Sequence, residues 1–157
     1  MKHFFLLTFF LLISVQAEQL KVVAKSFHGD EKSGITVFKG DVKITKGSDK
    51  LNADTVTIYT NAKRKPTKYV AKGNVSFFIK TENNSIYKGT AGKAVFVPAK
   101  KEYHFYENVH IAQTDEKKEI IGEEVIISTV EGKARAKGGD RKPVIMTFEI
   151  EEEEDKK

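Results

Sequence analysis

Three short segments of the chain share one pattern and recur at nearly constant spacing. Each places a two-residue step of glycine or glutamate followed by aspartate or asparagine before a valine: Gly40-Asp41-Val42, Gly73-Asn74-Val75 and Glu107-Asn108-Val109, which begin 33 and 34 residues apart. Apolar and polar residues alternate after each valine, the pattern of a strand with one buried and one exposed face. A regular repeat of this length predicts stacked copies of one unit, here a β-hairpin, that bury a shared apolar surface.

The segments around these repeats also predict short strands joined by turns. Strands are expected at 20–24, 35–38, 55–59 and 144–148, and the polar stretch Ser26 to Gly34 is expected to form a turn. No stretch of ten or more residues shows apolar residues at the helical period of 3.6. Short alternating strands with frequent turn signals indicate an all-β fold, an antiparallel sandwich or roll built from repeated hairpin units.

Small residues recur in the second half of each unit as well. The pairs Ala53-Asp54, Gly89-Thr90 and Gly122-Glu123 each precede a run rich in β-branched residues, where a bend or a close backbone approach is expected. Glu107 departs from the glycine that opens the other two copies of the main motif. The sequence therefore does not predict whether the third unit makes the same turn.

The two ends of the chain differ in character from its middle. A short basic start, an apolar run from Phe4 to Val15 and the small-x-small step Val15-Gln16-Ala17 predict a secretory signal peptide over residues 1–17. Residues 18–148 are then one exported β domain, and residues 149–157 form an acidic tail that is expected to be disordered. The chain contains no cysteine, so neither a disulfide nor a lipid anchor on cysteine is available.

The charge balance favours anionic partners but does not identify them. The chain holds 27 lysine and arginine residues against 22 aspartate and glutamate residues, and several of the acidic ones lie in the tail, so the body is more basic than the whole. Scattered lysines also keep β-sheet edges from associating, which is the simpler interpretation of the same pattern. The basic loop 61–68 lacks interleaved aromatic residues for base stacking, so no nucleic-acid partner is expected.

No pattern of catalytic or metal-binding residues is present. Outside the predicted signal peptide the histidines are His28, His104 and His110, and no cysteine accompanies them at ligand spacing. Neither a Gly-x-Ser-x-Gly motif nor a phosphate-binding loop occurs. The sequence therefore predicts no catalytic residues, no metal site and no cofactor.

The strand alternation predicts which side chains share the apolar face. On the residues alone, a closed sandwich core is the simpler use of such a face. The predicted face consists of Val42, Ile44, Val56, Ile58, Val75, Phe77, Val95, Val109, Ile111, Val125 and Ile127.

Four stretches together resemble the OstA-like family of lipopolysaccharide-transport proteins, and most closely its soluble periplasmic bridge member. They are residues 37–45, 50–56, 108–111 and 120–126, and the resemblance extends over about residues 20–148. It implies an open antiparallel β-roll, also called a β-taco or β-jelly roll. In such a roll the apolar face listed above holds the acyl chains of lipid A, while sugars and phosphates protrude from an open seam.

The resemblance also implies a location and partners. The protein is expected in the periplasm, where it binds lipopolysaccharide and carries it from an inner-membrane export complex to an outer-membrane translocon. Copies are expected to associate head to tail through their edge strands. Two alternatives stay open: an inner-membrane-tethered member of the same family, and a secreted glycan-binding or structural β-sandwich. The edge residues expected to meet partners are Leu20, Val22, Ala24, Val144, Met146 and Phe148.

Overall fold

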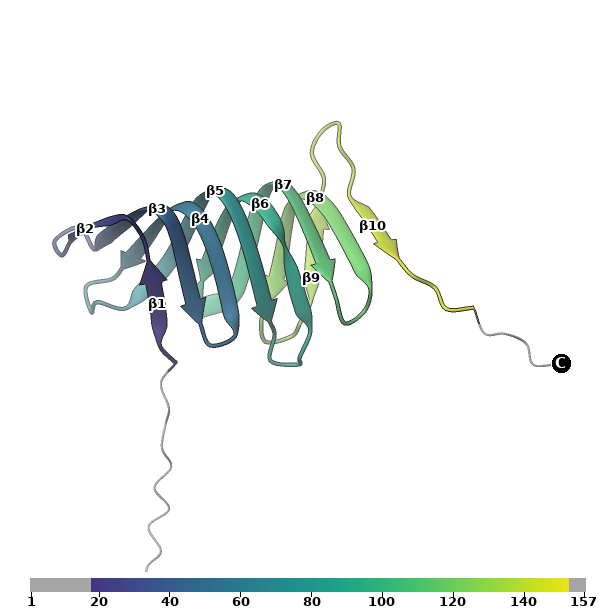
Figure 1. Ribbon diagram of the computed structural model, residues 1–157, viewed down its shortest axis with the longest axis horizontal. Coiled ribbons are helices and arrows are strands. Elements are labelled where there is room, and N and C mark those ends of the chain that lie inside the picture. Colours follow the sequence, from purple (N-terminus) through teal and green to yellow (C-terminus); the bar gives the residue numbers. More distant parts are fainter. Residues whose placement is uncertain (1–17, 153–157) are drawn as a thin grey trace, which may run out of the picture.

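The computed structural model describes residues 18–152. The predicted signal peptide and the end of the acidic tail, residues 153–157, lie outside the described residues. The described part is almost entirely β-structure (Figure 1). Its elements are β1 (Leu20–Val23), β2 (Ser26–Asp30), β3 (Ile35–Lys46), β4 (Asp49–Thr60), β5 (Pro66–Lys80), β6 (Ile86–Val97), the single 3-10 turn η1 (Pro98–Lys100), β7 (Glu102–Gln113), β8 (Lys118–Ser128), β9 (Ala134–Lys137) and β10 (Ile145–Phe148).

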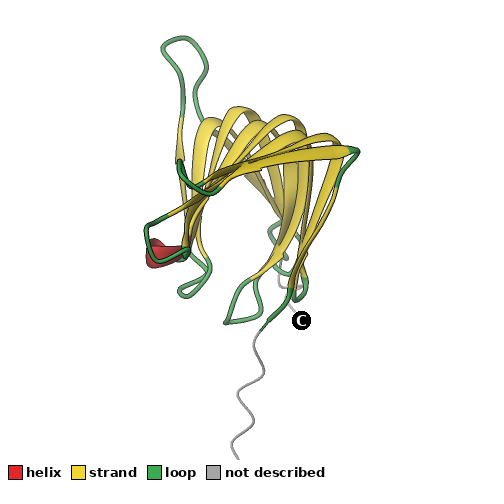
Figure 2. Cartoon of the chain, turned by 90° about the vertical axis from the view of Figure 1, so that its left-hand side faces the viewer, coloured by secondary structure: helices red, strands yellow, loops and turns green. Residues whose placement is uncertain are grey.

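All ten strands belong to one antiparallel sheet that does not close on itself. The order is β1-β3-β4-β5-β6-β7-β8-β10, with β2 paired to β3 and β9 paired to β8. Among the described residues the terminal strands β1 and β10 do not pair with each other. Viewed from the β2 end, the strands curve around an interior and most connecting loops lie on one side (Figure 2). The predicted all-β, open antiparallel roll is therefore confirmed, and the closed sandwich is excluded.

Each long strand bends near its middle, so the sheet forms two walls that meet along a corner. The register of every neighbouring pair of long strands shifts at this corner. We call the open side opposite the corner the seam. The first wall comprises β2, residues 35–39, 55–60, 66–72, 93–97, 102–106 and 124–128, and β9; the second wall comprises β1, residues 42–46, 49–53, 75–80, 86–91, 109–113 and 118–122, and β10.

The repeated sequence motif makes the corner. In β3 and β5 the glycine and the residue after it adopt positive φ: 86° and 44° at Gly40 and Asp41, and 82° and 47° at Gly73 and Asn74. Two successive residues in this left-handed region insert an extra step into the strand and turn it sharply. Asn74 stabilises its corner further by donating from Nδ2 to the Asp54 carboxylate at 2.9 Å.

The third unit makes the same turn without a glycine in the first position. Glu107 and Asn108 adopt φ values of 68° and 50°, close to those of the other two corners. The glycine has moved across the corner instead: a Cβ at Gly92 would lie 2.7 Å from the Cβ of Glu107, just as a Cβ at Gly73 would lie 3.0 Å from the Cβ of Asp54. Each of these two corners thus packs an acidic side chain over a glycine. At the second corner the glycine lies in the bulged strand β5, whereas at the third corner the acidic residue lies in the bulged strand β7.

Replacing Gly73 with alanine is expected to lower the free energy of unfolding by about 1–2 kcal/mol, because an L-residue is strained in the left-handed region. The added Cβ would also lie 2.4 Å from the Asp54 carboxylate oxygen. Gly29→Ala is the matched control, since its φ is not left-handed and its Cβ would meet only Thr36 at 3.5 Å. Urea titration measures both, and a Gly73→Ala protein as stable as Gly29→Ala would contradict this role for the corner.

One expectation about the strands is wrong. The stretch Ser26 to Gly34 is not a turn throughout, because its first five residues form β2 and pair in register with Ile35–Lys39 of β3. All five residues of β2 are exposed, so the segment carries no alternation of apolar and polar residues. An edge strand of this kind is specified by the strand beside it and not by its own pattern.

Candidate functional site

The apolar face that the repeats predict lies on the inside of the roll. Nine of its eleven predicted members are buried in the shared core, and Ile44 is half-buried against it. Together with other strand residues they form one continuous cluster that reaches across both walls. The nine buried members are Val42, Val56, Ile58, Val75, Phe77, Val109, Ile111, Val125 and Ile127.

The prediction is wrong for the eleventh member, Val95, which lies on the opposite face of the sheet. Its neighbour Ala94 is buried and Phe96 packs against the core, so in an extended strand Val95 points to the outer side. The cause is the corner: β6 turns at Ala91-Gly92, not at the predicted Gly89-Thr90, and the inward positions pass from Ala91 to Ala94. Gly89 instead allows a close approach of two backbones, the alternative expected for a small residue, since a Cβ there would lie 2.0 Å from the carbonyl oxygen of His110.

The corners change the side-chain parity of alternate strands. The bulged strands β3, β5 and β7 keep their parity, as the buried Ala71 and Val75 show on either side of one corner. The strands β4, β6 and β8 add a single residue there, and their inward positions lie three apart, as at Ala53 and Val56. In β4, β6 and β8, strict alternation therefore predicts the inward-facing side chains correctly on one wall and assigns them to the outer face on the other wall.

Toward the β1 end the interior opens into an apolar groove. The space in it that a water-sized molecule can reach is about 50 Å³. Both walls contribute, with aromatic rings from the first wall: Tyr69 lies 5.9 Å from Phe96, and Phe96 lies 4.5 Å from Tyr103, between ring centroids. The lining residues are Leu20, Ile44, Lys46, Asp49, Lys50, Leu51, Val56, Tyr69, Ala71, Phe77, Ile79, Ala94, Phe96 and Tyr103.

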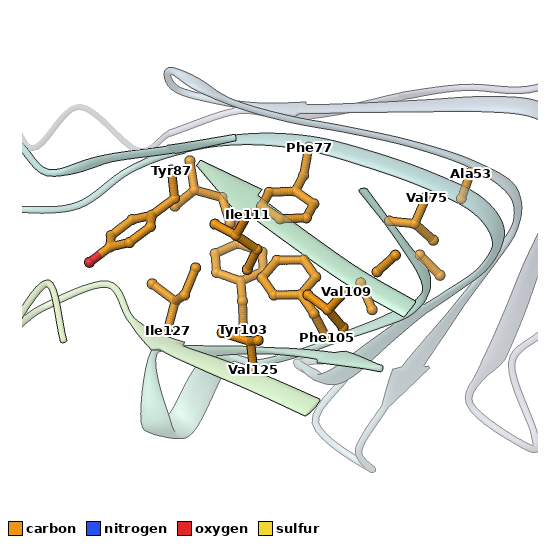
Figure 3. Close-up of a cluster of buried hydrophobic side chains, with 14 of the residues drawn as sticks. Ala53, Val75, Phe77, Tyr87, Tyr103, Phe105, Val109, Ile111, Val125 and Ile127 are labelled. Carbon is orange, nitrogen blue, oxygen red and sulfur yellow. The ribbon is translucent and has the colours of Figure 1, made fainter. Parts of the chain in front are cut away.

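Between the groove and the β10 edge, buried side chains from both walls pack against one another in the interior (Figure 3). Phe77 and Phe105 stack with their centroids 3.9 Å apart, and Tyr87, Phe105 and Ile127 are no more than 1% exposed. The groove therefore ends inside the roll, against side chains that belong to the same continuous apolar face.

A polar network lies at the mouth of the groove. The Tyr103 hydroxyl donates to Asp49 Oδ2 at 3.0 Å and the Lys80 backbone N–H donates to Asp49 Oδ1 at 3.0 Å. Burial raises the pKa of the Asp49 carboxyl above its ordinary value, and these hydrogen bonds oppose the shift only in part. Burial, together with the adjacent Asp49 carboxylate, also raises the pKa of Tyr103, which therefore stays a hydrogen-bond donor. The Lys46 ammonium lies 5.1 Å from the Phe96 ring centroid and brings positive charge to the same mouth.

The free energy of unfolding of the Asp49→Asn variant is expected to increase relative to that of the natural protein as the pH rises. A carboxyl whose folded pKa is raised contributes its full stability below the unfolded value of 3.8, and that contribution is lost as the pH rises through the folded pKa. Asparagine does not titrate, so the difference in free energy of unfolding between variant and natural protein should grow from about pH 3 upward and then level off. Urea titrations across this range measure it, and a difference that shrinks with rising pH would contradict the assignment.

The predicted edge residues lie at the two ends of the sheet. Leu20 and Val22 belong to β1, and Ala24 directly follows it. Val22 and Ala24 pack against the core. At the other end Val144 packs against the core, whereas Met146 and Phe148 of β10 are about half exposed. Cross-strand pairing of Val22 with Ile44 and of Met146 with Ile120 puts these side chains on the inner face. The apolar interior therefore runs from one edge strand to the other. The sequence did not reveal that β2 and β9 form a second edge at each end.

The described part of the chain offers neither a cluster of metal ligands nor a helix that could span a membrane. Within residues 18–152, no three His, Cys, Asp or Glu side chains gather in a way that could hold a metal ion. Over the same range, no helix has the length and apolar character needed to cross a membrane. His104 instead shares a hydrogen bond with Glu102 at 2.9 Å on the outer side of the first wall.

Comparison with known proteins gives consistent matches. Residues 21–133 match the family described as LptA/(LptD N-terminal domain) LPS transport protein. The lipopolysaccharide export system protein LptH of Pseudomonas aeruginosa is 43% identical over 47 residues, which is 30% of this chain and 27% of LptH, so the alignment spans about a quarter of that relative.

The fold comparison extends further than the sequence alignment. A crystal structure of LptH, described as the LptA-homologous periplasmic component of the lipopolysaccharide transport device of Pseudomonas aeruginosa, superposes with a TM-score of 0.76. The superposition covers 85% of this chain and 96% of that one at 20% identity, so it supports the fold. Since the family match covers most of the chain, the protein belongs to the LptA/(LptD N-terminal domain) family of LPS transport proteins.

Proposed function

We propose that the protein is a periplasmic carrier that holds lipopolysaccharide by its acyl chains and passes it toward the outer membrane. The observation that carries the proposal is the apolar interior, which runs between the two edge strands and opens as a groove at the β1 end. A chain of an LPS transport family has a direct use for such an interior. The protein needs no catalytic step for this, and we assign it none.

The groove suits the chemistry of an acyl chain. Each methylene moved from water into an apolar site contributes roughly 0.8 kcal/mol, so even a partly buried chain supplies substantial affinity. The aromatic side chains Tyr69 and Phe96 present flat apolar surfaces that favour sliding contacts over one fixed pose. Lys46 at the mouth offers a cation to a phosphate of the headgroup, which would stay outside the seam.

The ends of the sheet support head-to-tail association with further copies or with partners of the same fold. An unpaired edge strand adds another strand through backbone hydrogen bonds. Pairing β1 of one copy with β10 of the next would join two different surfaces, and a contact of that kind can propagate. It would also set Val22 beside Met146 and make the two interiors continuous. We propose that such a row joins an inner-membrane export complex, at the β1 end, to an outer-membrane translocon.

Binding of lipopolysaccharide and of its delipidated oligosaccharide to the purified chain tests the carrier function. We expect whole lipopolysaccharide to quench or shift the tyrosine fluorescence with saturation, and the sugar alone to have no effect at the same concentration. Binding of both with equal affinity would instead identify a glycan-binding β-sandwich. Binding of neither would leave the family fold without this carrier role.

A further inference from the structure

Within residues 18–152, the loops of the two walls are hydrogen-bonded to each other across the seam at one place. The turn between β5 and β6 contacts the loop that follows β8: the Glu82 N–H donates to the Thr129 carbonyl at 2.8 Å, and Asn83 Nδ2 donates to the Glu131 carbonyl at 3.3 Å. The Tyr87 hydroxyl donates to the Gly132 carbonyl at 2.7 Å. We call residues 81–85 and 128–132, with their mutual contacts, the seam clasp.

Both halves of the seam clasp are well defined internally. Thr81 and Ser85 are buried, and the Ser85 N–H donates to Thr81 Oγ1 at 3.0 Å, which fixes the shape of the turn. On the opposite side Gly132 has φ 64°, and a Cβ there would lie 2.3 Å from Asn83 Oδ1. The backbone of one half thus fits directly against the side chain of the other.

The rest of the rim is different. The first-wall loops 31–34 and 61–65 make hydrogen bonds and ion pairs to their own wall, and within residues 18–152 none of these reaches the second wall. Near the groove the two walls are instead connected by the inner Tyr103–Asp49 hydrogen bond. Hydrogen bonds between loops of opposite walls therefore lie over the filled part of the interior, whereas the groove is bridged by side chains alone, through the Tyr103–Asp49 hydrogen bond and the Lys46 ammonium over the Phe96 ring.

A closed seam limits what can move along the interior. An amphiphile with its acyl chains inside and its headgroup outside occupies the seam at every point of its path. Such a molecule cannot pass the seam clasp while the backbone and side-chain hydrogen bonds of the clasp cross that line. Its chains must also displace Tyr87 and Ile127, which are at most 1% exposed directly behind the clasp. Tyr87 links the two requirements, since its ring fills the interior and its hydroxyl holds the clasp (Figure 3).

We propose that the seam clasp is a gate, closed in the ligand-free chain, which must open before a lipid in the groove can move on toward β10. The proposal rests on the carrier function proposed above. Withdrawal of the Tyr87 side chain would release the Gly132 carbonyl and vacate interior space in one movement. Loading of the groove and passage beyond it are thereby separate steps.

The test locks the gate in cells and follows lipopolysaccharide on both sides of it. The chain has no cysteine, so Glu82→Cys with Thr129→Cys introduces one possible disulfide, between residues already joined by a backbone hydrogen bond. Photocrosslinking probes replace Phe96, which lines the groove, and Met146, which lies on the β10 side of the clasp. The matched control pair is Asn52→Cys with Ser76→Cys, cross-strand neighbours within the second wall whose side chains lie 3.2 Å apart.

We expect the locked protein to keep its lipopolysaccharide adduct at Phe96 and to lose the adduct at Met146 at least tenfold, relative to Glu82→Cys alone. The Asn52–Ser76 disulfide should change neither adduct. Equal Met146 adducts in locked and unlocked proteins would overturn the gate while leaving the carrier function intact. The absence of any adduct at Phe96 in the unlocked protein would instead refute the carrier function, and the gate with it.

A ligand-free measurement tests the clasp itself. Spin labels on Lys100→Cys and Thr114→Cys, exposed positions on the first and second wall, report the width of the seam. Tyr87→Phe with Asn83→Ala removes two clasp hydrogen bonds and should shift the distance distribution to longer values. Tyr59→Phe with Asn52→Ala is the control, and it should leave the distribution unchanged. No difference between the two double variants would show that these contacts do not hold the walls together.

Discussion

Phe105→Ala is expected to lower the free energy of unfolding by about 3–5 kcal/mol, the range seen when a large buried aromatic side chain is truncated. Phe105 is fully buried at the centre of the filled interior, and its ring stacks on Phe77. The residues around it come from both walls, so the bent sheet cannot collapse far enough to fill the space. A loss of this size is a large share of the stability of a small domain. Urea titration followed by circular dichroism measures it.

Phe27→Ala is the matched control for this prediction. Phe27 lies on the edge strand β2, where its side chain is 73% exposed, although its ring is 6.0 Å from that of Phe38. Its loss should change the stability by no more than about 0.5 kcal/mol. If Phe105→Ala were as mild as Phe27→Ala, the interior would not be the packed unit described here.

Ile44→Glu is expected to weaken lipopolysaccharide binding at least tenfold while leaving the protein folded. Ile44 lines the groove from the second wall and is only half-buried, so a charged side chain there can still reach water in the free protein. An acyl chain in the groove would remove that water from the carboxylate, which is strongly unfavourable without a partner. A tenfold change in affinity corresponds to only about 1.4 kcal/mol, well below the expected penalty.

The neighbouring Thr45→Glu separates this effect from a general effect of negative charge. Thr45 points to the outer face, with Lys21 and Lys50 as its cross-strand neighbours. Binding titrations of both variants should therefore show a loss for Ile44→Glu alone. Similar losses for both would point to an electrostatic surface site in place of the groove.

Much of the fold follows from local sequence. The repeated step of Gly or Glu before Asp or Asn marks all three bulged corners, and the alternation beyond these corners places five buried residues on the correct face. The alternation in β4 and β8 places four more there: Val56, Ile58, Val125 and Ile127. These features are local because a left-handed backbone position and a half-buried strand each favour particular residue types. The openness of the sheet is not local: the residues alone favoured a closed sandwich, and only the family resemblance implied the open roll.

The errors have physical causes that can be named. Strict alternation places Val95 on the inner face because it ignores the single-residue corner of β6, which is signalled only by Gly92. The sequence of β2 predicts a turn because an exposed edge strand has no buried face and therefore no alternation of apolar and polar residues. The seam clasp was not foreseen, since Asn83 and Gly132 are ordinary turn residues that meet only after the sheet has bent.

Photocrosslinking in living cells tests the central claim most directly. The photoreactive analogue p-benzoylphenylalanine is placed at Phe96, which lines the groove, and at its neighbour Val95, which faces outward. The two positions are adjacent in the same strand, so the two variants differ mainly in the face of the sheet on which the probe lies. A lipopolysaccharide adduct at Phe96 and none at Val95 is the expected result. Equal adducts at both positions, or none at Phe96 in a folded and exported protein, would contradict transport through the interior of the roll.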